Sequence, residues 1–296
     1  MNLHSIVRPE VVVAALLILA PMLGAAFFPA HVASLGKKLP RALFLLCPSL
    51  LCVPYALIAQ SFHMLRWNWL ALYASLPVAI AVVLSQARNA DPEKKGDWRD
   101  FLIILVLGLA VDLRWMEPAW PTGLTALGKM LMLDAGIFGF LAVRQLDGVG
   151  FDLRLRLRDA GIGLREFCFY APIAIFLGLS MRFLHFHAAW PASLSALGAY
   201  VFTFLFIAIP EELYFRGWLQ NLLERRIGRT AALAATAILF GLAHWNKRTT
   251  NFNWQYVLLA ALAGIFYGRA WRADRRVGAS AITHATVDTL WSLWFR

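Results

Sequence analysis

The sequence predicts an all-α protein, a polytopic transmembrane helical bundle of about ten spans. Of its 296 residues, 60% are hydrophobic and only 15% are charged, whereas a soluble globular domain carries about 25% charged residues. Apolar runs of the length of a membrane span recur from one end of the chain to the other. Lysine and arginine gather in every second loop between these runs, which is typical of membrane proteins with a fixed orientation.

Each expected span is an apolar run of roughly 16 to 20 residues, which suits a hydrocarbon core of about 30 Å. In chain order the runs cover residues 11–28, 42–59, 69–85, 101–116, 124–143, 167–184, 195–215, 231–245, 255–270 and 279–295. Charged and histidine side chains gather inside three of the last four runs, so we divide the chain by the chemistry of its side chains. Residues 1–194 are N-terminal spans of unassigned role, and residues 195–296 form the expected catalytic membrane core.

Positive charge predicts the orientation in the membrane. Most of the 28 lysines and arginines lie in the loops after the first, third, fifth, seventh and ninth runs. Because cytoplasmic loops carry the excess of such residues, we expect these loops in the cytoplasm and both termini outside. The expected location is a bacterial inner membrane, although the loops do not decide the host. The net charge of +11 does not indicate a nucleic-acid partner, since the basic residues are not gathered on one soluble face. The expected partners are the lipid bilayer and a peptide or protein substrate within it.

An acidic cluster interrupts the seventh run, where Glu211 and Glu212 follow Pro210 and precede Arg216. Carboxylates at membrane depth are costly and mark functional sites. Glu212 and Arg216 are four residues apart on one helix face, so they can form an ion pair. The helical period turns Glu211 about 100° away from that face, which leaves its carboxylate available. Pro210 lacks an amide N–H, and we expect the helix to bend just before the pair.

Two further pairs follow at the same spacing, Phe240 with His244 and His284 with Asp288. Each alone is a weak signal, because a single histidine in an apolar span is more often part of the core. Depth in the membrane can be counted from the nearest basic loop at 1.5 Å per residue. By this count the depths of four side chains span only about 10 Å: Glu211, His244, His284 and Asp288. Three helices therefore bring polar groups to a common level in the membrane.

At these residues the chain resembles the CPBP (CAAX protease and bacteriocin-processing) intramembrane peptidases, also called the Abi family, which includes the type II CAAX prenyl endopeptidases. The family pattern is EExxxR, FxxxH and HxxxN on successive membrane helices. Glu211, Glu212 and Arg216 match the first motif, and Phe240 with His244 the second. His284 matches the third, where Asp288 stands in place of the more usual Asn.

The resemblance implies a metal-independent, glutamic-type intramembrane endopeptidase that needs no cofactor. Glu211 and His244 would activate water, and His284 with Asp288 would stabilise the oxyanion. Glu212 and Arg216 would support Glu211, and Phe240 would fix the rotamer of His244. The nearest alternative chemistry is a zinc site made of a glutamate and two histidines, although the chain has no HExxH motif.

The expected substrate is a membrane-associated protein of the CAAX type, prenylated in a eukaryote, or an unprenylated membrane peptide in a bacterium. Two other functions stay open from the sequence. One is a non-catalytic scaffold or immunity protein of the same fold. The other is a proton-coupled transporter that uses the buried acids and histidines as a relay, although the chain shows no inverted repeat.

Overall fold

A computed structural model describes residues 8–187, 193–247 and 251–295. This part of the chain is helical and contains no β-strand, and an isolated antiparallel bridge joins Phe186 to Phe295. The predicted all-α class is therefore confirmed. Each of the ten predicted runs overlaps a helix or a series of consecutive helical segments.

Six helical runs within the described residues are long and apolar enough to cross a membrane. They are Pro9–Phe27, Arg41–Ser61, Trp67–Ala90, Thr125–Val143, Leu157–Ser180 and Ser193–Ile227. The remaining predicted spans coincide with helices that are shorter or more polar, such as Trp98–Asp112 with 15 residues and Arg229–Leu242 with 14. The structure thus supports several spans but does not confirm the predicted count of ten.

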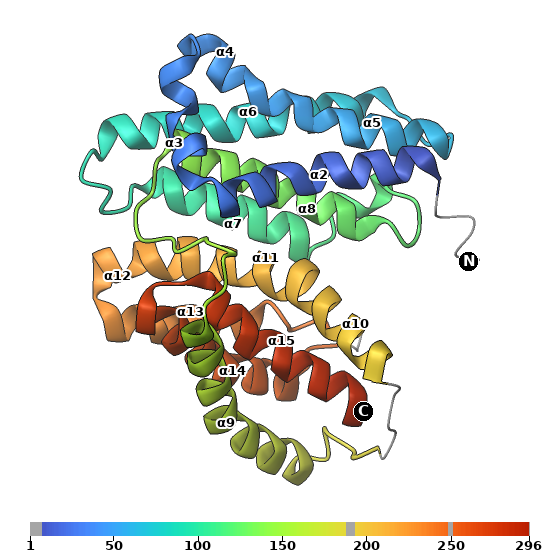
Figure 1. The fold of residues 1–296 in the computed structure, drawn as a ribbon, viewed down its shortest axis with the longest axis vertical. Helices are drawn as coiled ribbons and strands as arrows, with labels where there is room; N and C mark the ends of the chain where they lie inside the picture. The colour runs from blue at the N-terminus through green and yellow to red at the C-terminus, as the bar shows by residue number, and fades with distance from the viewer. Residues whose placement is uncertain (1–7, 188–192, 248–250, 296) are drawn as a thin grey trace. The chain divides into compact units, whose positions relative to one another are not determined.

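Residues 1–147 form one compact unit of packed helices. Its described segments are α2 (Pro9–Phe27), α3 (Pro29–Lys38), α4 (Arg41–Leu46), η1 (Cys47–Leu51), α5 (Cys52–Ser61), α6 (Trp67–Ala90), α7 (Trp98–Asp112), η2 (Glu117–Ala119), α8 (Thr125–Ile137) and the π-helical η3 (Phe138–Val143). Helix α6 packs against α7 and α8, and α2 packs against α5 and α8 (Figure 1). The apolar runs of the N-terminal half therefore bury their faces against one another.

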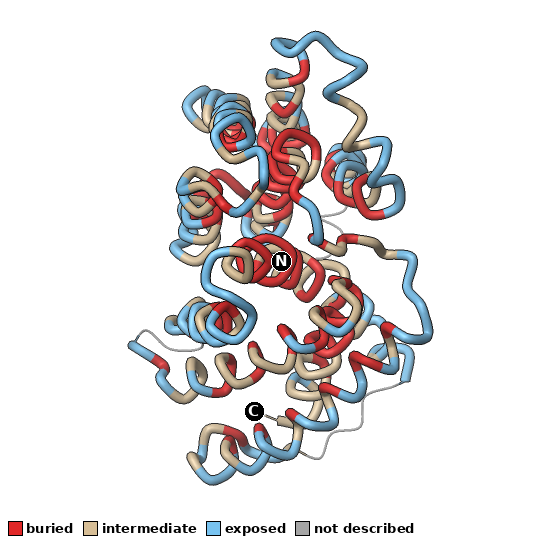
Figure 2. The backbone as a smooth tube through the Cα atoms, turned by 90° about the vertical axis from the view of Figure 1, so that its left-hand side faces the viewer, coloured by how far each residue is buried: buried red, intermediate tan, exposed pale blue. Residues whose placement is uncertain are grey.

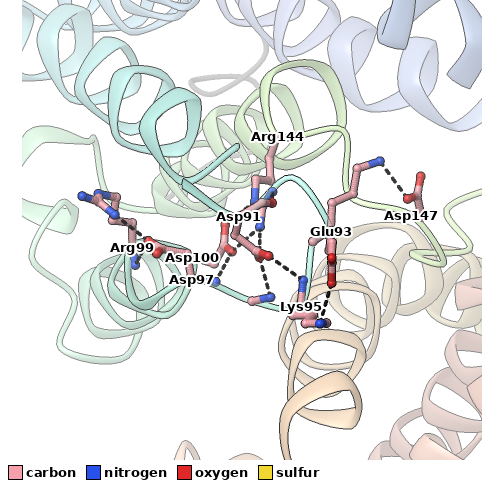
Figure 3. A network of polar contacts seen from close by, with 10 residues as sticks. Asp91, Glu93, Lys95, Asp97, Arg99, Asp100, Arg144 and Asp147 are labelled. Atoms are coloured by element: carbon pink, nitrogen blue, oxygen red, sulfur yellow. Dashed lines mark hydrogen bonds and ion pairs between the residues drawn. The ribbon is translucent and has the colours of Figure 1, made fainter. Parts of the chain in front are cut away.

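Arg144, which follows η3, ties the polar end of this unit together (Figure 3). Its side chain is fully buried, with Nε 2.8 Å from Asp100 Oδ1 and Nη2 2.6 Å from Asp91 Oδ2. Asp97 caps α7 by accepting a hydrogen bond from the backbone N–H of Arg99. Two carboxylates and a buried guanidinium satisfy one another, which is what a buried charge requires.

Residues 148–296 form the second compact unit. Its described segments are α9 (Leu157–Ser180), α10 (Ser193–Thr203), the π-helical η4 (Phe204–Ala208), α11 (Ile209–Glu212), the π-helical η5 (Leu213–Gln220), α12 (Asn221–Ile227), α13 (Arg229–Leu242), α14 (Trp254–Asp274) and α15 (Val277–Trp294). Helix α14 packs against α13, α9 and α15, and α9 also packs against α15 (Figure 1). By packing, α9 belongs with the C-terminal helices, whereas our division at residue 194 was made by chemistry.

Glycines allow these helices to approach closely. A methyl group added at Gly163 of α9 would lie 2.7 Å from the Ile282 side chain, and one at Gly264 of α14 would lie 3.0 Å from the Ala237 backbone. Small residues at helix contacts are how membrane helices gain packing energy, because lipid chains provide no hydrophobic drive for association. The close packing brings α15 against the helices that carry the polar cluster.

Large apolar side chains are also exposed on the outward faces of the helices, while buried residues follow the faces that meet (Figure 2). Examples are Leu16 at 62% exposure, Phe176 at 70% and Leu197 at 59%. Extended apolar surface of this kind is unfavourable in water and is suited to lipid. With the six apolar runs, it identifies a membrane protein.

Candidate active site

The acidic cluster lies within one long helical run, Ser193–Ile227. The run is α-helical at Glu211 and Glu212 and π-helical on both sides of them, in η4 and η5. Pro210 cannot donate the backbone hydrogen bond that its position in the helix requires, which frees a carbonyl one turn earlier. Wider π-helical turns accommodate such a break and are frequent at functional sites.

Glu212 and Arg216 form the ion pair that their spacing predicts. Arg216 Nη1 lies 3.1 Å from Glu212 Oε1, and both side chains are fully buried. The guanidinium also donates from Nη2 to the Gly264 carbonyl at 3.1 Å and lies 4.6 Å above the Phe240 ring centroid. The charge on the arginine is therefore balanced by a carboxylate, a carbonyl and an aromatic face.

His284 lies at the centre of the carboxylates. Its Nδ1 is 2.8 Å from Glu212 Oε1, and its Nε2 is 3.4 Å from Asp288 Oδ2 and 3.9 Å from Glu211 Oε2. The imidazole stacks on Tyr267, with ring centroids 4.7 Å apart and an angle of 17° between the planes. The ring is buried, and its orientation is fixed on both edges and on one face.

Ser280 belongs to the same cluster, although the sequence analysis did not include it. Its hydroxyl donates to Glu212 Oε2 and lies 2.9 Å from the Tyr267 carbonyl oxygen. A spacing signal was present, since Ser280, His284 and Asp288 are four residues apart in succession and share one face of α15. Tyr267 gives no such signal, because its place under the imidazole depends on how α14 packs on α15.

His244 lies in the turn that follows α13. Its Nδ1 is 2.8 Å from the Phe240 carbonyl oxygen. A carbonyl oxygen only accepts hydrogen bonds, so Nδ1 carries the proton and the neutral ring keeps a lone pair on Nε2. The ring packs against Phe240 and Tyr256, with centroid distances of 4.8 and 5.1 Å, and it interacts electrostatically with Glu211.

A cavity of about 230 Å³ opens beside these groups. Its polar residues include His244, His284 and Asp288, and its aromatic walls are Tyr170, Phe240, Tyr256, Tyr267 and Trp291. The side chains of Glu211 and Asp288 are 34% and 40% exposed, whereas Glu212 is fully buried. The cluster therefore combines one enclosed carboxylate with two that remain accessible, next to space for a water molecule and part of a peptide.

The structure brings all seven predicted site residues into one region of the second unit. Direct contacts join Glu211, Glu212, Arg216, His284 and Asp288. Phe240 and His244 join them through aromatic packing, since the Phe240 ring lies 5.7 Å from His284 and 4.8 Å from His244. Within the described part of the chain, no three His, Cys, Asp or Glu side chains are grouped so that they could hold a metal ion.

Comparison with known proteins places the same segment in a family. Residues 193–290 match the model of the Rce1-like family, whose description is type II CAAX prenyl endopeptidase Rce1-like. No curated protein and no solved structure matches the chain significantly. The matched segment contains every residue of the cluster, and the resemblance drawn from the three sequence motifs is confirmed.

Proposed function

We propose that this chain, an intramembrane protease with an Rce1-like domain at residues 193–290, hydrolyses a peptide bond of a membrane-associated CAAX-type substrate with water activated by Glu211 and His244. The observation that carries the proposal is the convergence of Glu211, His284 and Asp288 beside a cavity that His244 also lines. The substrate is prenylated or unprenylated according to the host.

Glu211 is the proposed general base. Of the two adjacent glutamates, Glu212 is enclosed by Arg216, His284 and Ser280. The Glu211 side chain is 34% exposed, and its Oε2 has no hydrogen-bond partner in the described part of the chain. A water molecule between Glu211 and Nε2 of His244 would meet two acceptors, one for each of its hydrogens. Held in this way, its oxygen lone pair is free to attack a carbonyl carbon.

The chemical step balances with these groups alone. Glu211 takes one proton from water as the water oxygen bonds to the carbonyl carbon, and the carbonyl electron pair moves to its oxygen. An N–H at Nε2 of His284, the nitrogen that Glu212 does not hold, would stabilise that oxyanion. When the tetrahedral intermediate collapses, the C–N bond breaks and the leaving amine receives the proton from Glu211, directly or through His244.

The reaction is proposed to need no metal. A zinc ligand must turn a nitrogen lone pair or a carboxylate oxygen towards the ion, whereas both nitrogens of His284 face carboxylates. Without His284, one histidine and the glutamate fall short of the three protein ligands that a catalytic zinc ion usually has.

Purified protein in lipid nanodiscs should cleave membrane-anchored CAAX-type peptides at the same rate with and without EDTA or 1,10-phenanthroline. A zinc protease in the same mixture provides the control for chelation. Peptide binding without any product would support the non-catalytic scaffold instead. Loss of activity in chelator that added Zn²⁺ restores would contradict the metal-free mechanism.

The basic loops are proposed to face the cytoplasm of a bacterium, with both termini outside. Starting from a variant in which Cys47, Cys52 and Cys168 are alanine, a cysteine at Glu93, in the exposed α6–α7 loop, should react with an impermeant maleimide only after permeabilisation. A cysteine at Asn68, at the opposite end of α6, should react in intact cells. The reverse pattern would show that the orientation is inverted.

A further inference from the structure

Two carboxylates face the two nitrogens of His284, and this arrangement limits the protonation state of the ring. Nδ1 is 2.8 Å from Glu212 Oε1, and Nε2 is 3.4 Å from Asp288 Oδ2. A neutral imidazole has one N–H and one lone pair, whereas an ionised carboxylate offers only lone pairs. A neutral ring would therefore turn a lone pair towards one carboxylate. An imidazolium presents an N–H to both.

We propose that His284 works as an imidazolium cation held between Glu212 and Asp288, and that Asp288 is the residue that keeps it charged. The proposal rests on the proposed function only for its catalytic consequence. The titratable and charged groups around His284 include Glu211, Glu212 and Arg216 on the long helical run, His244 after α13, Tyr267 on α14, Tyr170 on α9 and Asp288 on α15 itself.

The charges around the ring favour this assignment. Glu212 already receives hydrogen bonds from Arg216 and Ser280, so it is held as a carboxylate that accepts from Nδ1. Arg216 supplies the one fixed positive charge of the cluster, against Glu211, Glu212 and Asp288. A proton on His284 brings the charges of the cluster nearer to balance, which is favourable in the low dielectric around the buried ring.

The proposal also explains how aspartate can stand where the motif usually has asparagine. An asparagine amide can donate its own N–H to a bare Nε2, so the histidine can stay neutral. An ionised aspartate cannot donate a hydrogen bond, so the hydrogen between the two side chains must be carried by Nε2 of the histidine. An imidazolium paired with an ionised aspartate and a neutral imidazole paired with an asparagine both have a net charge of zero. In the first pair the imidazole ring carries one more proton. During catalysis the positive charge of the ring would stabilise a nearby oxyanion more strongly than a neutral ring would.

The direct test is ¹⁵N NMR of histidine-labelled protein in nanodiscs, with the His284 signals assigned by their loss in His284→Phe. In the wild type we expect two protonated ring nitrogens at pH 7 and pH 8. In Asp288→Asn at the same pH, we expect one protonated and one bare nitrogen, and Asp288→Glu should restore the cation. Asp274→Asn, which removes a carboxylate paired with Arg158 at the end of α14, is the control and should leave the signals unchanged.

These spectra need no substrate, so they remain informative even if the protein cleaves nothing. A neutral His284 in the wild type, or an imidazolium that persists in a folded Asp288→Asn variant, would overturn the proposal. If the protein is active, the alkaline limb of its kcat profile should move to lower pH or disappear in Asp288→Asn, because the carboxylate that favours the protonated ring is gone. An unchanged profile would also contradict the proposal.

Discussion

Glu211→Gln should abolish peptide cleavage while leaving the protein folded and inserted. The amide has nearly the shape of the carboxylate but cannot take a proton from water, and general-base catalysis is worth roughly 10²- to 10⁴-fold in rate. The side chain is 34% exposed and lies 3.9 Å from His284 Nε2, and its Oε2 has no hydrogen-bond partner among the described residues, so its neutralisation removes only a long ion pair. We therefore expect kcat to fall by about that factor with little change in the thermal unfolding midpoint.

Single-turnover cleavage of a membrane-anchored peptide measures the effect. Glu10→Gln makes the same chemical change on an exposed part of α2 and should keep full activity. Because Glu211 and His244 are proposed to hold the same water molecule, Glu211→Gln and His244→Phe should not be additive. The double variant should be about as slow as the slower single one. Turnover at the wild-type rate by Glu211→Gln would rule out this residue as the base.

Arg216→Met should be among the most destabilising substitutions in the second unit. The variant keeps the fully buried Glu212 carboxylate but removes the guanidinium 3.1 Å away from it. It also removes the hydrogen bond to the Gly264 carbonyl and the cation above Phe240. Removal of one partner of a buried ion pair costs about 3–5 kcal/mol, because the other partner loses a charge that offsets its desolvation.

The free energy of unfolding in mixed micelles measures the loss. The double variant Glu212→Gln/Arg216→Met should recover part of it, since no buried carboxylate is then left without its arginine. Arg216→Lys should recover less than the full stability, because lysine cannot reproduce the planar fork that meets both a carboxylate and a carbonyl. Arg229→Met, at the exposed start of α13, is the control and should be neutral. Equal stability of Arg216→Met and the wild type would mean that the pair does not stabilise the fold.

The helices could be predicted because apolar run length and charge spacing are local properties of the chain. Each predicted run overlaps a helix, and the Glu212–Arg216 pair follows from a separation of four residues on one helix. The span count was less predictable. Short or polar helices such as α7, α13 and α15 depend on their packing partners, and run length alone does not decide whether they cross the membrane.

The sequence by itself determined the helical class through its apolar runs and the ion pair through a spacing of four residues, and its three motifs named the seven residues that the structure brings together. Only the tertiary structure decided which groups meet across helices. It placed His284 between Glu212 and Asp288, put Ser280 on the far oxygen of Glu212 and stacked Tyr267 on the imidazole. These contacts depend on how closely α14, α15 and the long helical run approach. That distance is set by packing of side chains far apart in the sequence, which no local pattern records.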